Sequence, residues 1–137
     1  MVAEDELPIQ RNLSNNIERL NPAFQVSVRA SNGREAIEAL KREAIQVIFL
    51  DINMPVIDGM EVLKYIYDND IPAITVILSG YQEFAYAQQA VRYGAKEYLL
   101  KPLKKEQLSE ILKKIEQELT DREYQQKFQV YEGLITG

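Results

Sequence analysis

The sequence has 137 residues, of which 46% are hydrophobic and 27% charged, with a formal net charge of −5. Its length is that of about one domain, and its composition is typical of a folded globular chain. The absence of cysteine and histidine excludes disulfides, thiolate metal sites, catalytic thiols and histidine general bases. The negative charge argues against nucleic-acid binding by this chain alone. The short apolar runs and the missing signal-peptide pattern predict a cytoplasmic protein that does not enter a membrane.

Short apolar segments alternate with amphipathic ones along the chain, a pattern typical of βαβ units that build a parallel sheet. The predicted strands are residues 2–3, 24–30, 47–50, 74–78 and 98–100. The predicted helices are residues 8–20, 33–43, 60–67, 84–93 and 104 to about 119. We therefore expect an α/β fold, a doubly wound five-stranded parallel sheet.

Several helix ends and faces can be predicted from single residues. The first helix has Ile9, Leu13, Ile17 and Leu20 at helical spacing, which predicts its buried face. Either Ser31 or Asn32 caps the second helix, and Gly94 ends the fourth. The fifth helix carries Leu108, Ile111, Leu112, Ile115 and Leu119 on one face.

The last residues continue a helical spacing in Tyr124, Phe128, Tyr131 and Ile135, out of phase with the preceding stripe. Residues 120–123 also form a capping box, so either a new helix begins there or one long helix continues. We expect a domain at residues 1–118 and a helical connector at residues 119–137, with packing of this segment on its own domain as the alternative.

Polar residues follow four of the five predicted strands, and in open α/β sheets the functional site lies at such strand ends. They are Glu4, Asp5 and Glu6 after the first strand, Asp51 after the third, Ser79 and Gly80 after the fourth, and Lys101 after the fifth. With the strand order 2-1-3-4-5, the first and third strands lie about 4.8 Å apart. Asp5 and Asp51 are then neighbours.

Three carboxylates so close together repel one another, and this repulsion raises the pKa of at least one of them. Lys101 supplies one compensating charge for Glu4, Asp5 and Asp51, and a divalent cation supplies two more. Because all available ligands are oxygens, Mg²⁺ is the metal that fits best. A backbone carbonyl from the loop at Ile52 and Asn53 completes the protein's share of the ligands.

A carboxylate beside a metal, a lysine and a serine hydroxyl is suited to phosphoryl transfer. Asp51 can attack phosphorus as a nucleophile and form an acyl phosphate, while Lys101 neutralises charge on the phosphoryl oxygens. Ser79 then donates a hydrogen bond to the new phosphoryl group, and this movement can act as a signal.

Four motifs occur in one order: residues 4–6 (EDE), 49–59 (FLDINMPVIDG), 77–81 (ILSGY) and 98–102 (YLLKP). Together they resemble the receiver domain of bacterial two-component response regulators, over residues 1 to 118. The resemblance implies a flavodoxin-like fold with strand order 2-1-3-4-5 and a signalling domain rather than an enzyme acting on other substrates.

The resemblance also implies a role for each matching residue. Asp51 is the phosphoacceptor, Asp5 and Asp51 bind Mg²⁺ directly and Glu4 binds it through water, Lys101 holds the phosphoryl group, Ser79 and Tyr98 form a switch pair, and Asn53 and Tyr81 flank the path of the hydrolytic water. The Lys101–Pro102 bond is cis. The implied donor is a sensor histidine kinase.

More narrowly, residues 78–87 (LSGYQEFAYA) resemble receivers fused to AraC-type helix-turn-helix domains. DNA binding and transcription regulation would then reside in an output domain that this sequence lacks. A homodimer through the fourth helix, fifth strand, fifth helix and connector is a further expectation.

Three other functions are compatible with parts of this pattern. A degenerate receiver would act only as a protein-interaction module. An aspartyl-phosphate hydrolase of the haloacid dehalogenase type needs a second Asp two residues after the nucleophile, where this chain has Asn53. A flavin-binding module would need a Ser/Thr/Gly-rich phosphate loop after the first strand, which the sequence lacks.

Overall fold

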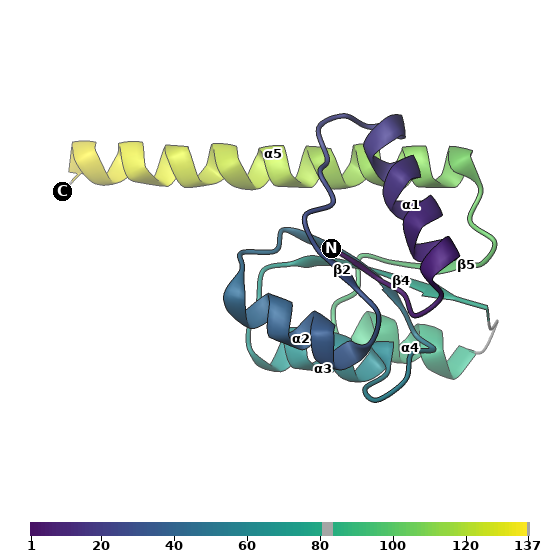
Figure 1. Cartoon of the computed structure of the whole chain (residues 1–137). Helices are drawn as coiled ribbons and strands as arrows, with labels where there is room; N and C mark the ends of the chain where they lie inside the picture. The colour runs from purple at the N-terminus through teal and green to yellow at the C-terminus, as the bar shows by residue number, and fades with distance from the viewer. Residues whose placement is uncertain (81–83, 137) are drawn as a thin grey trace.

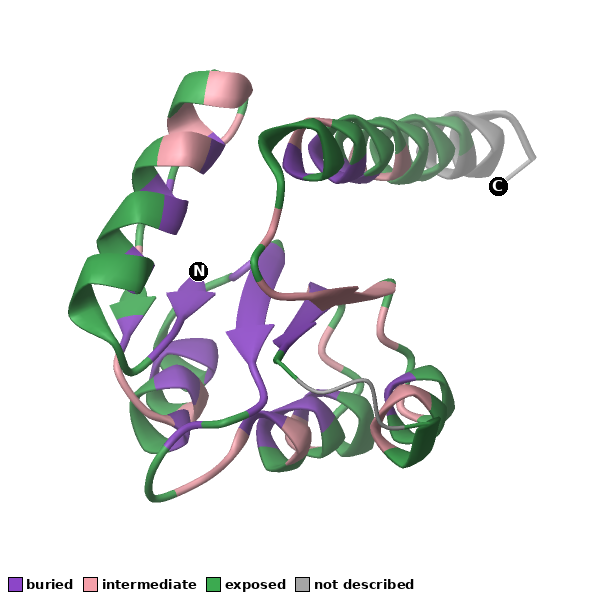
Figure 2. Ribbon diagram, turned by 90° about the vertical axis from the view of Figure 1, so that its right-hand side faces the viewer, coloured by how far each residue is buried: buried purple, intermediate pink, exposed green. Residues whose placement is uncertain are grey.

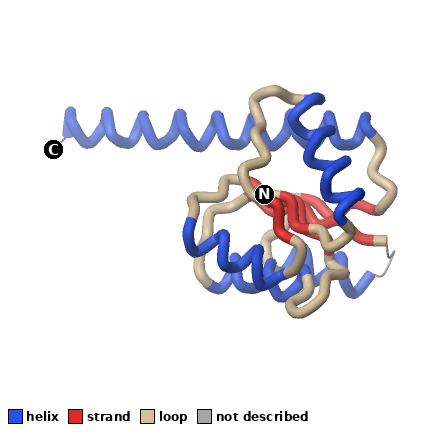
Figure 3. Tube along the Cα trace, viewed as in Figure 1, coloured by secondary structure: helices blue, strands red, loops and turns tan. Residues whose placement is uncertain are grey.

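The structure, a computed structural model, describes residues 1–80 and 84–136, and side chains as far as residue 128. Strands and helices alternate along the chain (Figures 1 and 3). The strands are β1 (Val2–Ala3), β2 (Arg29–Ala30), β3 (Val47–Asp51), β4 (Ile74–Ser79) and β5 (Glu97–Leu100). The helices are α1 (Leu7–Leu20), α2 (Gly33–Arg42), α3 (Gly59–Asp68), α4 (Phe84–Arg92) and α5 (Lys105–Thr136).

The five strands form one parallel sheet in the order β2-β1-β3-β4-β5, which confirms the predicted fold class and strand order. Helices α1 and α5 cover one face of the sheet, and α2, α3 and α4 cover the other (Figures 1 and 2). The order reverses between β1 and β3, so their carboxyl ends lie where this fold places its site.

Two hydrophobic clusters fill the space on either side of the sheet. Alternate residues of β3 point to opposite faces: Ile48 and Leu50 belong to the cluster under α2, α3 and α4, and Val47 and Phe49 to the cluster under α1 and α5. Every residue of β3 and β4 is buried, as expected for strands covered on both faces.

Helix ends follow side-chain capping. Asn32, rather than Ser31, caps α2 by accepting a hydrogen bond from the Glu35 N–H at 2.9 Å. Gly94, which follows α4, has a φ of 77°, a left-handed conformation that glycine adopts without steric cost.

The Lys101–Pro102 peptide bond is cis, as the resemblance to receiver domains implies.

The predicted buried face of α1 is partly wrong. Ile9 is exposed, and the buried residues are Gln10, Leu13, Ser14 and Ile17. Leu13 and Ile17 are buried as predicted, and Leu20 packs partly against the core. Gln10 and Ser14 lie on the same side of the helix as Leu13 and Ile17, so the buried face includes two polar side chains in place of Ile9.

The predicted second strand, residues 24–30, is too long. Only Arg29–Ala30 pairs in the sheet, opposite Val2–Ala3 of β1. At the edge of the sheet β2 pairs with β1, which itself consists of Val2–Ala3. Alternating apolar residues are therefore not sufficient for a strand without a partner.

The last helix is continuous from Lys105 to Thr136, so no new helix begins at the capping box. Thr120 donates a hydrogen bond from its hydroxyl to the Glu116 carbonyl at 2.9 Å, one turn back, instead of capping a new helix. Beyond residue 120 the side chains described are exposed, and the helix projects away from the sheet (Figure 1).

The fourth helix leaves apolar surface uncovered. Phe84 and Val91, seven residues apart on α4, are 77% and 78% exposed, whereas Tyr86 and Tyr93 pack partly against the core. No helix in the described parts of the chain combines the length and the hydrophobicity needed to cross a membrane.

Candidate functional site

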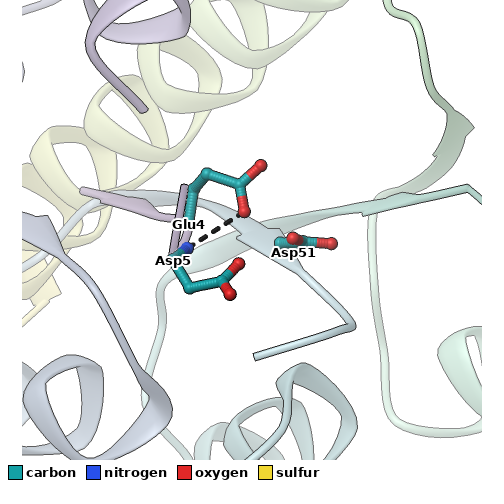
Figure 4. A group of neighbouring side chains, drawn as sticks. All are labelled: Glu4, Asp5 and Asp51. Atoms are coloured by element: carbon teal, nitrogen blue, oxygen red, sulfur yellow. Dashed lines mark hydrogen bonds between the residues drawn. The ribbon is translucent and has the colours of Figure 1, made fainter. Parts of the chain in front are cut away.

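Three carboxylates meet at the carboxyl ends of β1 and β3 (Figure 4). Glu4 follows β1 directly and Asp51 ends β3, and both are buried, with 2% and 4% exposure. Asp5 is exposed. Each residue offers an oxygen, and these oxygens lie within 4.8 Å of one another. We refer to Glu4, Asp5 and Asp51 as the acidic cluster.

Backbone pairing brings these residues together. Ala3 of β1 pairs with Leu50 of β3. Because the strands are parallel, the residues that follow this pair, Glu4 and Asp51, lie next to each other. The Glu4 N–H also donates a hydrogen bond to the Ala30 carbonyl at 2.9 Å, which ties the end of β1 to the end of β2.

Lys101 is the cation of this site. Its Nζ donates hydrogen bonds to Glu4 Oε1 at 2.8 Å and to Asp51 Oδ2 at 3.0 Å. Its backbone N–H donates to the Ser79 carbonyl at 2.8 Å, so the ends of β4 and β5 are tied together as well. Burial disfavours the charged form of Lys101, but the hydrogen bonds to Glu4 and Asp51 outweigh this effect and raise the pKa of Lys101.

Burial is also the main cause of a raised pKa at Glu4, which lies at about 8. The neighbouring Asp51 raises this pKa further, and Lys101 opposes the change. One of the three carboxyls thus has a raised pKa, as predicted, but burial is a larger cause than the repulsion that the sequence suggested. Even with Glu4 protonated, Lys101 balances only one of the two remaining carboxylates, so the site keeps an excess of negative charge.

This excess fits a divalent cation. The donors are carboxylate oxygens, two of them buried, and Mg²⁺ prefers oxygen ligands in an octahedral arrangement. Asn53 lies next to the cluster, since its backbone N–H donates to Asp51 Oδ1 at 3.3 Å. The residues present therefore suit the metal that the sequence predicts.

The structure also places the two expected switch residues. Ser79 ends β4 and is buried, one strand away from Asp51. Tyr98 of β5 pairs in register with Ile77 and packs partly against the core cluster under α4. Tyr81, expected beside Asn53, lies outside the described residues.

Two residues that shape this site had no role in the sequence reasoning. Gly59 begins α3, and a Cβ there would collide with the carbonyl oxygen of Asp51, while its N–H donates to the Ile52 carbonyl at 2.8 Å. Gln10 is buried and donates to the Glu4 carbonyl. Gly59 stands in the motif at residues 49–59, and Gln10 stands one turn before Leu13, so a helix phase set by Leu13 and Ile17 would have found it.

Comparison with known proteins supports the resemblance to receiver domains. Residues 1–113 match the family described as response regulator receiver domain. The chain is 32% identical to the uncharacterized transcriptional regulatory protein YesN of Bacillus subtilis, over 93% of this chain and 34% of that protein. It is 34% identical to an uncharacterized response regulatory protein of Vibrio cholerae, over 87% of this chain and 45% of that protein.

Solved structures agree. The receiver domain of AraT, a response regulator from Geobacillus stearothermophilus, superposes with a TM-score of 0.78 at 33% identity, over 89% of this chain and 95% of that one. The receiver family consists of signalling domains of two-component systems rather than conventional enzymes. With this fold, the acidic cluster at the strand ends and the family match over residues 1–113, the chain belongs to the response regulator receiver domain family.

Proposed function

We propose that this chain accepts a phosphoryl group on Asp51 from the phosphorylated histidine of a sensor kinase. The observation that carries the proposal is the buried Asp51 carboxylate, which lies in the acidic cluster and accepts a hydrogen bond from Lys101. An Asp51 oxygen forms a bond to phosphorus while the bond from phosphorus to the histidine nitrogen breaks, and its electron pair returns to the imidazole. The chain contains no histidine, so the imidazole belongs to the partner.

Each polar group of the site has a part in this transfer. Glu4, Asp5, Asp51 and the backbone carbonyl of Asn53 would hold Mg²⁺, which supplies positive charge next to the phosphoryl oxygens. Lys101, already bonded to Glu4 and Asp51, turns toward the phosphoryl group once that group is attached. Ser79 donates its hydroxyl to the same group.

The movement of Ser79 toward the phosphoryl group carries the signal to β5, where Tyr98 follows into the space that Ser79 leaves. The affected surface is that of α4, β5 and the start of α5. Asn53 lies beside the path by which water reaches the acyl phosphate and so influences the lifetime of the phosphorylated form. The resemblance gives Tyr81, which lies outside the described residues, a part in the same step.

The chain spans about a third to a half of the length of the curated relatives named above. We propose that residues 1–118 are the receiver unit and residues 119–137 the connector to an output domain. We further propose that this output domain binds DNA and that the protein acts in the cytoplasm, in keeping with the description of YesN as a transcriptional regulatory protein.

A second copy of the chain is a proposed partner of α4, β5, α5 and the connector. Support comes from the projecting part of α5, where Tyr124 and Phe128 are 69% and 51% exposed and stack on each other with ring centroids 6.5 Å apart. Exposed aromatic pairs on a helix are typical of surfaces that a partner covers.

Labelling with a small acyl-phosphate donor tests the phosphoacceptor role. The wild-type chain is expected to gain one phosphoryl mass in the presence of Mg²⁺ and none in EDTA. Asp51→Asn is expected to fold and to gain none, because the amide keeps the shape and loses the nucleophile.

Asp58→Asn is the matched control. It makes the same chemical change seven residues along the chain, at the residue that caps α3, and its labelling should equal that of wild type. Labelling of Asp51→Asn at the wild-type level would refute the assignment. A wild-type chain that takes no label would instead support a degenerate receiver that acts through protein contacts.

A further inference from the structure

Gln10 is a buried polar side chain beside the acidic cluster. It lies on α1, is 6% exposed, and its side-chain amide uses Nε2 to donate two hydrogen bonds, each 3.0 Å long. One goes to the carbonyl oxygen of Glu4 and the other to the carbonyl oxygen of Ala30. The amide therefore joins α1 to the ends of two neighbouring strands.

The two carbonyls mark the point where β1 and β2 end and the chain turns away from the sheet. The Glu4 N–H donates to the same Ala30 carbonyl, so the pairing of the strands continues to this residue. The amide of Gln10 adds one more bond in the same place, through a side chain instead of a strand. Since burial removes water as an alternative partner, the Glu4 carbonyl depends on this bond.

This bond acts on the residue that provides an exposed metal ligand. Asp5 follows Glu4 directly, and its backbone N–H donates to Glu4 Oε2 at 3.0 Å (Figure 4). The Asp5 side chain is exposed, so surrounding side chains do not restrict it as they restrict Glu4 and Asp51. Its direction is set by the backbone at Glu4, and that backbone is held by Gln10.

We propose that Gln10 is a positioning residue of the metal site, which raises Mg²⁺ affinity by fixing the backbone that carries Glu4 and Asp5. This inference rests on the proposed function, because it takes the acidic cluster as the site of Mg²⁺. Groups that hold metal ligands from behind typically change metal affinity about 10- to 100-fold when they are removed.

Calorimetric titration with Mg²⁺ alone tests the proposal. Gln10→Leu keeps the size of the side chain and removes both donors, and its Kd for Mg²⁺ is expected to rise about 10- to 100-fold. Ser14→Ala is the matched control, because it removes another buried hydrogen bond of α1, from Ser14 Oγ to the Gln10 carbonyl at 2.7 Å, without touching Glu4 or Ala30. Its Kd should stay at the wild-type value.

Gln10→Asn provides a second variant in case Gln10→Leu fails to fold. It keeps a buried amide but is one methylene shorter, so it cannot reach both carbonyls, and a weaker loss of affinity is expected. Amide hydrogen exchange in EDTA gives a readout without metal: Glu4 and Asp5 should exchange faster in both Gln10 variants than in Ser14→Ala.

Wild-type Mg²⁺ affinity in the folded Gln10 variants would overturn the inference, and so would an equal loss in Ser14→Ala, which would indicate a general effect on stability. A wild-type chain that does not bind Mg²⁺ would overturn the proposed metal site itself. The two failures are therefore distinguished by the wild-type titration.

Discussion

Glu4 is a carboxyl group whose charged form is costly in the folded protein when no metal is bound. Burial raises its pKa to about 8, and the nearby Asp51 adds to this effect. In the unfolded chain the same group has an ordinary pKa near 4.5. Between these two values the folded protein holds a proton that the unfolded protein has released.

This difference predicts a pH-dependent stability. In EDTA, the contribution of Glu4 is fully present below about pH 4.5 and is lost as the pH rises toward 8, with a slope of up to about 1.4 kcal/mol per pH unit. Urea unfolding of wild type and Glu4→Gln across this range measures it. The stability of wild type relative to Glu4→Gln should fall as the pH rises.

Glu6→Gln, two residues away at an exposed position, is the control and should run parallel to wild type. The α-amino group of Met1 works in the opposite direction, because burial lowers its pKa to about 6 and so favours folding as the pH rises from 6 to 8. The comparison with Glu4→Gln removes this contribution, which both chains share. A constant difference between the two chains over the whole range would contradict the prediction.

At the residue scale, the acidic cluster could be predicted because its members end strands, and parallel strands bring their carboxyl ends to one edge. Asp51, Glu4 and Lys101 follow from this rule alone. Gln10 acts through its side-chain amide on the backbone of another element, and Gly59 acts through the side chain that it lacks. Neither effect has a local pattern, so both needed the three-dimensional structure.

Among the loops, the one between β3 and α3 contains a strained residue. Val56 has a φ of 70°, in the left-handed region that β-branched side chains rarely adopt. It is also 67% exposed, so its side chain contributes little burial in return. The backbone strain costs about 1–2 kcal/mol.

Val56→Gly is therefore expected to stabilise the protein. Glycine removes the strain but also increases the conformational entropy of the unfolded chain. The expected net increase in the free energy of unfolding is therefore about 0.5–1 kcal/mol. The same substitution at Val91, 78% exposed within α4, should destabilise by about 0.3–0.5 kcal/mol because glycine is a poorer helix former than valine. Thermal unfolding of the two variants should shift in opposite directions, and a lower midpoint for Val56→Gly would contradict the strain argument.

At the element scale, the sequence predicted the bounds of an element well where neighbouring elements pack along its whole length, and poorly where they do not. The central strands β3 and β4 were predicted to within one residue, since both of their faces and edges are covered. Residues 24–28 have strand-like composition but do not form part of β2, although the Val28 carbonyl accepts a hydrogen bond from the Val2 N–H. At residue 120 a local capping pattern competes with helix continuation, and the continuous helix is the outcome.

The whole molecule consists of a sheet domain and the projecting half of α5. The first part of α5 buries Leu108, Ile111, Leu112 and Ile115 against the sheet. In the later part, as far as its side chains are described, Tyr124 and Phe128 are exposed and stack on each other on one face of the helix. A lone helix of this length is marginal in water, so a partner surface would stabilise it.

We expect phosphorylation to tighten dimerisation through this segment. A coupling of about 1–3 kcal/mol corresponds to one or two orders of magnitude in the dimer Kd. Sedimentation of the full chain and of a chain ending at Leu119, each with and without a phosphoryl mimic on Asp51, measures it. The full chain with the mimic should associate most strongly.

The double substitution Tyr124→Ala and Phe128→Ala should reduce this association to the level of the shortened chain. Gln125→Ala, an exposed neighbour on the same helix, should leave it unchanged. Identical association of all samples would refute a role of the connector.

Because α5 is unbroken to Thr136, it fixes both the distance and the orientation, relative to the sheet domain, of any domain attached at its far end. Each residue adds about 1.5 Å and about 100° of rotation, so residues 120–136 span roughly 25 Å along the helix axis. Arg122 still donates a hydrogen bond to the Pro72 carbonyl at 2.8 Å, so the part that leaves the domain begins after this residue. Two residues inserted after Thr120 would turn the far end by about 200°, nearly to the opposite side, whereas seven would bring it back to within about 20°. A series of insertions at this point would separate the effect of reach from that of rotation.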